Sequence, residues 1–265
     1  MSAGPPTPED PASVDLARYQ AWLFDMDGVL TKTADVHAAA WKEAFDGFLK
    51  EESTRTGKTY APFDVGADYQ QYVDGEPRAD GVRNFLAARG ITLPEGNDDD
   101  PTNARTVSGV GNRKNELVLR VMATQGVAVY DGAVALVKEL RRRGVKVAVV
   151  SASENTQAAL SAAGIDDLFD ARVDGHVVKD LHLAGKPASD SFLEGATMLG
   201  VTADQAVVIE DALAGVQAGR SGHFALVVGV DNHDGAGQHE YADELHAHGA
   251  NVVVRDLREL LGTPD

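Results

Sequence analysis

Two aspartates, Asp25 and Asp27, stand two residues apart directly after the apolar run AWLF. Their carboxylates repel each other, so the pair is either a simple turn, in which Asp and Gly are common, or part of a site that offsets the charge. One carboxylate is able to attack phosphorus, and the other is able to move a proton to or from the leaving oxygen. The pair therefore suggests phosphoryl-transfer chemistry, and the rest of the chain decides between a turn and a site.

More side chains suited to this chemistry follow later apolar runs. They are Ser151, Ser153, Asn155, Lys186, Glu210 and Asp211. Clustered carboxylates in a chain without cysteine favour a hard cation such as Mg²⁺ with oxygen ligands. Lys186 and the metal would offset the charge of a phosphate, and the Ser151 hydroxyl would donate to a phosphate oxygen. The set predicts a magnesium-dependent phosphoryl-transfer site.

The elements that must position these residues are five short apolar runs, 21–24, 145–150, 206–209, 225–228 and 251–254. The runs lack strict alternation, which is typical of strands buried on both faces of a parallel sheet. Helical patterns at 132–144, 189–200 and 213–222 separate the last four runs. We therefore predict an α/β fold with a doubly wound, Rossmann-like parallel sheet, whose ligand site lies at the carboxyl ends of the strands.

About 120 residues separate the first two strands, and they contain no convincing strand. Helical patterns cover 33–52, 68–90 and 113–126, with a loop at 94–112. A connection of this length with its own helices is best interpreted as an inserted domain. We therefore expect the following division: a disordered tail at 1–17, an α/β catalytic core at 18–33 and 128–265, and a helical cap at 34–127.

Composition limits the partners. The chain has 265 residues, a formal net charge of −17, no cysteine and no apolar run long enough for a membrane span. We expect no nucleic-acid or membrane partner, because no Lys/Arg stripe appears, and a cytoplasmic monomer by default. The His- and Asp-rich segment 231–250 suggests either metal binding or a loop with a solvated helix, and the second interpretation is favoured.

Four motifs in order, FDMDGVL, VVSAS, GKP and VVIEDALAGVQAG, resemble those of the haloacid dehalogenase superfamily of aspartyl-phosphate phosphotransferases. The resemblance implies that Asp25 is the nucleophile and Asp27 the general acid/base. It implies that Ser151 and Lys186 bind phosphate. It also implies Mg²⁺ ligands from Asp25, the Asp27 backbone carbonyl and Asp211, with Glu210 close by.

Within that superfamily, TKTADVHAAAW, GEPRADG, NRKNE and SASEN resemble the β-phosphoglucomutase subfamily. The implied substrate-binding residues are Thr33, His37, Trp41, Gly75, Arg78, Lys114, Ser153 and Asn155. Simpler interpretations remain for three of them. His37 fits a packed helix residue, Arg78 a solvated loop residue and Lys114 a solvated helix face.

Two positions depart from the subfamily pattern. Glu154 and Asp74 stand where well-known members have basic residues, and both changes remove positive charge from a site for two phosphates. Three functions follow as alternatives. The first is a mutase that converts β-glucose 1-phosphate to glucose 6-phosphate through the 1,6-bisphosphate. The second is a magnesium-dependent sugar-phosphate hydrolase, and the third is a non-catalytic phospho-acceptor module.

Overall fold

The computed structural model describes residues 10–232 and 238–262. Its contacts divide the chain into two compact units. We call residues 1–32 with 128–265 the core unit, and residues 33–127 the insert unit. Residues 1–9 of the expected disordered tail lie outside the described residues. Residues 10–17 depart from that expectation, because Asp10 and Asp15 cap two short 3-10 helices, η1 (Pro11–Ser13) and η2 (Leu16–Arg18), and Leu16 is buried.

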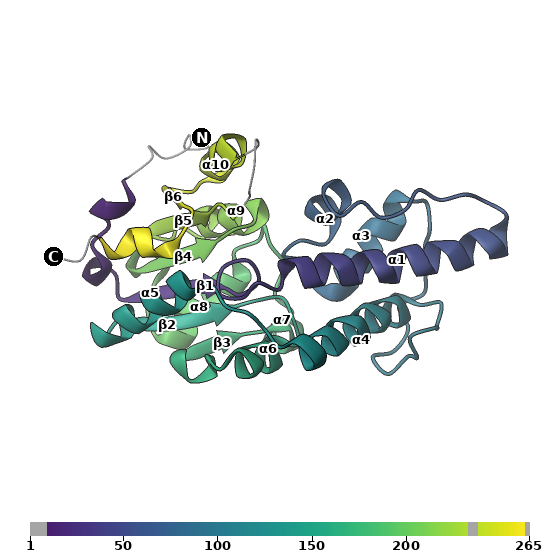
Figure 1. The fold of residues 1–265 in the computed structure, drawn as a ribbon, viewed down its shortest axis with the longest axis horizontal. Coiled ribbons are helices and arrows are strands. Elements are labelled where there is room, and N and C mark those ends of the chain that lie inside the picture. Colours follow the sequence, from purple (N-terminus) through teal and green to yellow (C-terminus); the bar gives the residue numbers. More distant parts are fainter. Residues whose placement is uncertain (1–9, 233–237, 263–265) are drawn as a thin grey trace. The chain divides into compact units, whose positions relative to one another are not determined.

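The core unit is built on a six-stranded parallel sheet in the order β3-β2-β1-β4-β5-β6 (Figure 1). Its strands are β1 (Ala21–Asp25), β2 (Lys146–Val150), β3 (Ala171–Val173), β4 (Ala206–Glu210), β5 (Leu226–Val230) and β6 (Val252–Val254). The order reverses direction between β1 and β4, which places a switch point beside the central strand. The predicted α/β class is confirmed.

Helices alternate with these strands and cover the sheet. They are α5 (Asp131–Arg142), α6 (Thr156–Ala163), α7 (Gly175–Asp180), α8 (Asp190–Leu199), α9 (Leu213–Ser221) and α10 (Gln238–His248), with short turns η3 (Asp166–Leu168), η4 (Ala203–Gln205) and η5 (Leu257–Leu261). Leu23, Val150 and Val208 pack with Phe192 of α8 and Leu245 of α10 in one buried cluster. This burial of β-branched and aliphatic side chains is the main stabilising contribution to the sheet.

Strand β3 was missed by the sequence pattern. Its three residues, Ala171–Val173, are too few to show a period, and Arg172 interrupts the apolar run. The strand pairs with β2, so that Val150 lies opposite both Asp25 of β1 and Val173 of β3. This register brings the polar residues that follow β1 and β2 to one edge of the sheet.

The insert unit consists of four helices, α1 (Ala34–Thr56), α2 (Ala67–Tyr72), α3 (Arg78–Ala88) and α4 (Val107–Gln125). Its centre is aromatic: the Phe45 ring lies 4.8 Å from that of Trp41, 4.1 Å from that of Phe85 and 5.2 Å from that of Phe63. The single helix expected at 68–90 is wrong. Gly75, at φ +70°, and Pro77 form a turn that divides it into α2 and α3.

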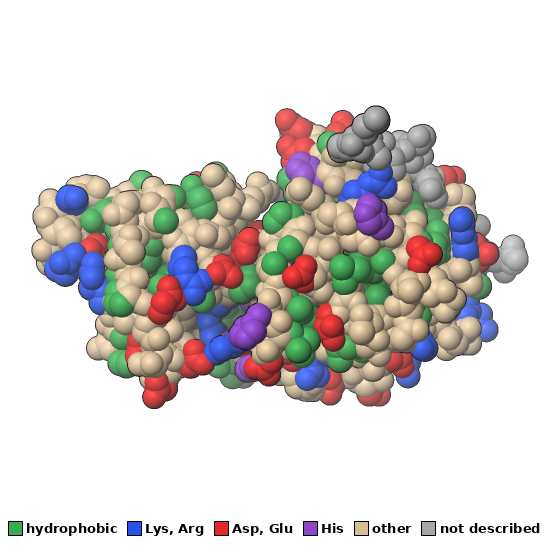
Figure 2. Space-filling model, turned by 180° about the vertical axis from the view of Figure 1, so that it is seen from behind, with side chains coloured by type: hydrophobic (Ala, Val, Ile, Leu, Met, Phe, Trp, Pro, Cys, Tyr) green, Lys and Arg blue, Asp and Glu red, His purple; other side chains and the backbone are tan. Residues whose placement is uncertain are grey.

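The expected loop at 94–112 ends earlier than predicted. Helix α4 starts at Val107, because the Thr106 side chain accepts a hydrogen bond from the backbone N–H of Gly109 and caps the helix. Among the described residues, no helix combines the length and apolar character needed to cross a membrane. Figure 2 shows one face on which acidic side chains are interspersed with the basic ones.

Candidate active site

Asp25 is the last residue of β1, and its side chain is buried at the carboxyl end of the sheet. Hydrogen-bonded neighbours on both sides, β2 and β4, hold this strand in place. Asp27 follows in the turn, where its backbone pairs with that of Thr31, and it is partly buried. Asp25 is buried and Asp27 is only partly buried, so Asp27 is the more accessible of the two aspartates.

Lys186 reaches this strand end from the loop before α8. Its ammonium donates to Asp25 Oδ1 at 2.6 Å and to Glu210 Oε1, and it lies 5.0 Å from the centre of the Phe192 ring. Lys186 and Glu210 are 3% and 1% exposed, so solvent screens these charges little. The three side chains are 161 and 24 residues apart in sequence and meet only because the sheet brings β1 and β4 together.

Burial raises the pKa of the Asp25 carboxyl well above its usual value, and the neighbouring carboxylates of Glu210 and Asp27 add to this, while Lys186 opposes it. Lys186 behaves in the opposite way. Although burial lowers its pKa, the charges of Asp25 and Glu210 raise it above the ordinary lysine value. Lys186 therefore stays an ammonium, and additional positive charge beside Asp25 would favour its ionised form.

Three carboxylates, from Asp25, Glu210 and Asp211, each present an oxygen within 4.8 Å of the other two. With the Lys186 ammonium they carry a formal charge of −2, which one divalent cation would balance. A donor set made only of oxygens suits Mg²⁺, so the residues present fit the predicted metal. Asp27, the fourth predicted ligand, lies in the turn that follows Asp25.

Next to the carboxylates of Asp25, Glu210 and Asp211, position 28 requires a glycine. Its φ is +84°, and a Cβ atom there would collide with the Asp211 carboxylate. Gly215 lies in the first turn of α9. A Cβ atom at this position would collide with Oε1 of Glu210. Glu210 Oε2 also accepts from the Ala212 N–H at 2.8 Å. The carboxylates of Asp211 and Glu210 therefore each pack directly against the backbone of a glycine, Gly28 and Gly215 respectively.

The loop after β2 places Ser151 and Ser153 at the same edge of the sheet. Ser151 is buried, and its Oγ accepts from the Ser153 N–H at 3.1 Å, while Ser153 Oγ accepts from the Asn155 N–H at 3.2 Å. The Ser153 carbonyl accepts from the Gly175 N–H at 3.0 Å. These bonds stabilise a tight loop beside the strand that ends in Asp25.

In the insert unit, the structure brings together His37, Trp41 and Lys114. The Lys114 ammonium donates to His37 Nδ1 at 3.0 Å and lies 4.9 Å from the Trp41 ring centre. Since an ammonium has no acceptor, a neutral His37 carries its proton on Nε2. His37 and Lys114 are both buried, so the solvated interpretation of Lys114 is wrong.

The other predicted residues of this unit lie at element ends. Thr33 is buried at the N-cap of α1, Gly75 lies in the turn after α2, and Arg78 is the first residue of α3. The aliphatic part of Arg78 lies against Gly111 of α4, where a Cβ would stand 3.3 Å from Arg78 Cγ. Arg78 is therefore positioned by α4 and is only partly exposed.

Two contacts at the core site lie in the segment interpreted as a loop and a solvated helix. The Tyr241 hydroxyl donates to the Asp211 carbonyl at 2.6 Å, and the Asn232 amide donates to the Gly28 carbonyl. No motif marks either residue. The sequence signal for Asn232 was its position after an apolar strand, where the predicted site residues of the core unit also lie.

Known proteins of one family are similar to this chain in sequence and fold. A family model of haloacid dehalogenase-like hydrolases matches residues 19–223. The β-phosphoglucomutase of Mycobacterium bovis is 50% identical over 244 residues, which are 92% of this chain and 92% of that protein. A crystal structure of β-phosphoglucomutase from Clostridium difficile superposes with a TM-score of 0.68 at 24% identity, over 91% of this chain and 93% of that one. CbbY of Rhodobacter sphaeroides, in complex with xylulose-(1,5)bisphosphate, gives 0.66 at 21% identity over 92% and 97%.

Proposed function

Because the chain belongs to the haloacid dehalogenase-like hydrolase family, we propose that it is a β-phosphoglucomutase acting through an aspartyl phosphate on Asp25. The observation that carries the proposal is the buried Asp25, bonded to Lys186 and grouped with Glu210 and Asp211. The substrate assignment is supported by the relative named β-phosphoglucomutase at 50% identity over most of both chains. The reaction would convert β-glucose 1-phosphate to glucose 6-phosphate.

In the first half of the proposed cycle, the phosphoryl group on Asp25 passes to the 6-hydroxyl of the sugar. The sugar oxygen bonds to phosphorus while the bond to Asp25 breaks, and Asp27 takes the hydroxyl proton. The bisphosphate then reorients. Asp25 attacks the phosphorus on the anomeric oxygen, and Asp27 returns its proton to that oxygen as glucose 6-phosphate forms.

The surrounding side chains have distinct tasks in this proposal. Lys186 holds Asp25 and the transferring phosphate, and the Ser151 hydroxyl donates to a phosphate oxygen. Asp25, Glu210 and Asp211, with the Asp27 carbonyl, would hold Mg²⁺, which when bound supplies positive charge to the phosphoryl oxygens. Arg78, with Ser153, Asn155 and the pair of His37 and Lys114, would hold the phosphate that does not react.

A second candidate is a sugar-phosphate hydrolase, in which water attacks the phosphorylated Asp25. Two positions favour it, because Glu154 and Asp74 add negative charge where a second phosphate would bind. Glu154 lies in the loop after β2 and packs against Gly175, so closely that a Cβ atom at Gly175 would be 2.7 Å from the Glu154 backbone nitrogen. Asp74 precedes Gly75 in the turn between α2 and α3.

One assay separates the two candidates. The enzyme is given β-glucose 1-phosphate with Mg²⁺ and a trace of glucose 1,6-bisphosphate, and glucose 6-phosphate and free phosphate are measured together. We expect glucose 6-phosphate to account for nearly all the substrate consumed. Release of one phosphate per substrate would support the hydrolase, and no turnover of any phosphate ester would contradict both.

A further inference from the structure

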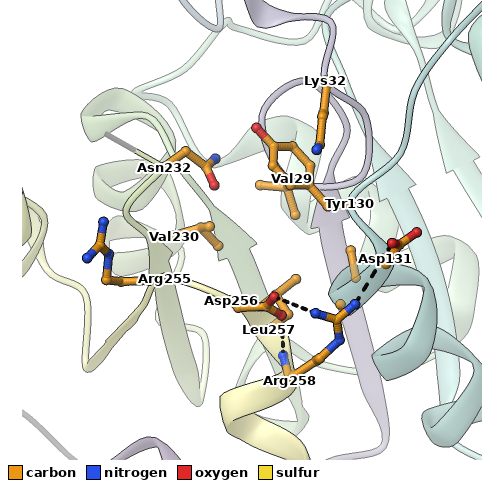
Figure 3. A pocket seen from close by; sticks show the side chains of 12 residues that line it. Val29, Lys32, Tyr130, Asp131, Val230, Asn232, Arg255, Asp256, Leu257 and Arg258 are labelled. Atoms are coloured by element: carbon orange, nitrogen blue, oxygen red, sulfur yellow. Dashed lines mark hydrogen bonds and ion pairs between the residues drawn. The ribbon is translucent and has the colours of Figure 1, made fainter. Parts of the chain in front are cut away.

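Two side chains that follow β5 donate hydrogen bonds to backbone carbonyls of the candidate active site. The Tyr241 hydroxyl, on α10, donates to the Asp211 carbonyl at 2.6 Å. The Asn232 side-chain amide, two residues after β5, donates to the Gly28 carbonyl. Figure 3 shows Asn232 near Val29, and both residues line a cavity of about 150 Å³ on the core unit. The Tyr241 ring is partly buried against the core cluster.

The two carbonyls belong to residues that approach each other closely. Gly28 lies so near the Asp211 carboxylate that a Cβ would collide with it. The position of this carboxylate therefore depends on where two backbone segments lie, the turn after β1 and the turn after β4. Asn232 holds the first segment and Tyr241 holds the second.

The peptide groups around Asp211 are thus fixed from two directions. On one side, Glu210 Oε2 accepts from the Ala212 N–H at 2.8 Å, a bond within the turn itself. On the other side, the Tyr241 hydroxyl comes from a helix that starts 27 residues later in the chain. A carboxylate ligand with a fixed backbone loses less conformational entropy when it binds a cation than a mobile one does.

We propose that Asn232 and Tyr241 are positioning residues for the divalent cation site and set its affinity for Mg²⁺. The inference rests on the proposed function only in assigning a cation to Asp25, Glu210 and Asp211. Neither residue has to contact the cation or the substrate for this role. Their loss should therefore change metal affinity more than substrate affinity.

The test compares wild type, Tyr241→Phe and Asn232→Ala by calorimetric titration with Mg²⁺ and by the rise in melting temperature that Mg²⁺ causes. Losing one neutral hydrogen bond should raise the Mg²⁺ dissociation constant about three- to ten-fold. At saturating Mg²⁺, the KM for sugar phosphate should stay within about two-fold. Tyr60→Phe, which removes a hydroxyl from the insert unit, should leave the Mg²⁺ dissociation constant unchanged.

The double variant provides a second measurement. Both hydrogen bonds position the same contact between Gly28 and Asp211. The fold-change in the Mg²⁺ dissociation constant of the double variant should therefore differ from the product of the two single-variant fold-changes. Unchanged Mg²⁺ affinity in both single variants, with a lower melting temperature, would show a purely structural role and overturn the inference. If wild type itself binds no Mg²⁺, the proposed metal site fails and this inference fails with it.

Discussion

The buried ion pair between Asp25 and Lys186 costs hydration energy, and the proposed function gives a reason for it. Two charges removed from water lose more hydration energy than their attraction commonly restores, so apolar residues would pack here at lower cost. Glu210 and Asp211 add further negative charge, and Gly28 and Gly215 lack side chains where these carboxylates lie. The local chain thus keeps a buried cluster of charges at a cost in stability, and a cation bound there would favour the ionised carboxylate that attack on phosphorus requires.

Asp27→Asn tests the proposed acid/base role. The variant keeps its shape but is unable to exchange a proton with the sugar oxygen, so sugar-phosphate turnover should fall at least a hundred-fold. Labelling of Asp25 by a reactive donor whose leaving group needs no proton should persist. Mass spectrometry of the intact protein measures the extent of this phosphorylation. Loss of labelling as well would place Asp27 in the support of Asp25 instead.

Arg78→Ala tests the second phosphate position. Removing a charge-assisted contact worth roughly 1.5–3 kcal/mol should lower kcat/KM for a sugar bisphosphate about ten- to a hundred-fold. An aryl phosphate, which has one phosphate only, should be hydrolysed or transferred at nearly the wild-type rate. Arg83→Ala is the matched control, since Arg83 lies on the same helix and pairs with Asp80 and Glu95. Equal losses on both substrates would indicate that Arg78 supports the fold.

Glu76 gives a pH-dependent test of the turn before α3. Burial, with a smaller contribution from Asp80, raises its pKa to about 7. A carboxyl with a raised folded pKa stabilises the protein most at low pH, and this stabilisation is lost as the pH rises through about 7. Glu76→Gln should therefore raise the unfolding free energy at pH 8 by about 1 kcal/mol, after allowing for solvent screening, and change it little at pH 5. Urea denaturation at both pH values measures this, and equal effects at the two would contradict it.

At the scale of elements, α1 connects two different environments along its 23 residues. Its first two turns carry His37 and Trp41 beside Lys114. Its last turns carry Glu52, which accepts from Arg55 on the same helix and from Arg105 in the loop before α4. Aromatic residues pack the middle of the helix, and the ion pair between Glu52 and Arg105 connects its end to the loop before α4. Loop 94–106 is long and has few apolar anchors, so this ion pair restrains it.

Glu52→Gln should loosen that loop. Hydrogen bonds from Arg55 and Arg105 lower the pKa of Glu52 to about 2, so the stabilisation is present above its ordinary pKa and is lost as the pH falls from about 5 towards 2. The substitution should reduce the unfolding free energy at pH 7 by about 1–2 kcal/mol and flatten its dependence on pH in that range. Chemical denaturation measures both. Glu139→Gln breaks a similar pairing with Arg142 and Arg143, which lie three and four residues away at the end of α5, and should have a much smaller effect.

At the scale of the whole molecule, two short connections join the core unit and the insert unit. They are tied to each other, because the Lys32 N–H donates to the Ala128 carbonyl at 2.9 Å and Thr31 pairs with Val129 in an antiparallel bridge. A mutase must protect its aspartyl phosphate from water, yet let a bisphosphate turn around. We therefore propose that the two units move relative to each other about these connections during turnover.

Small-angle X-ray scattering tests this proposal. Substrate together with a phosphate mimic should lower the radius of gyration relative to the free enzyme, because the insert unit would close on the occupied core. The same ligands added to Arg78→Ala should give a smaller decrease. Identical profiles with and without ligands in the wild type would indicate that the two units keep one arrangement.

The fold class and the residues at the edge of the sheet could be predicted from the sequence, because both depend on short stretches of the chain. Buried parallel strands are apolar on both faces, so runs such as VKVAVV and AVVI are visible without alternation. Residues that follow such runs must meet at one edge of the sheet, and this placed Asp25, Ser151 and Glu210 together before any coordinates. The resemblance of four ordered motifs then indicated the chemistry, and the family match agrees with it.

Tertiary structure alone decided the features that depend on contacts between distant residues. The three-residue strand β3 is too short to show a period and exists because β2 offers it hydrogen-bonding partners. Lys114 looks like a solvated helix residue until α1 brings His37 and Trp41 to it. Asn232 and Tyr241 belong to no motif, because a side chain that holds a backbone carbonyl needs only the right position. Such a position is set by packing over the whole core, which no short stretch of sequence encodes.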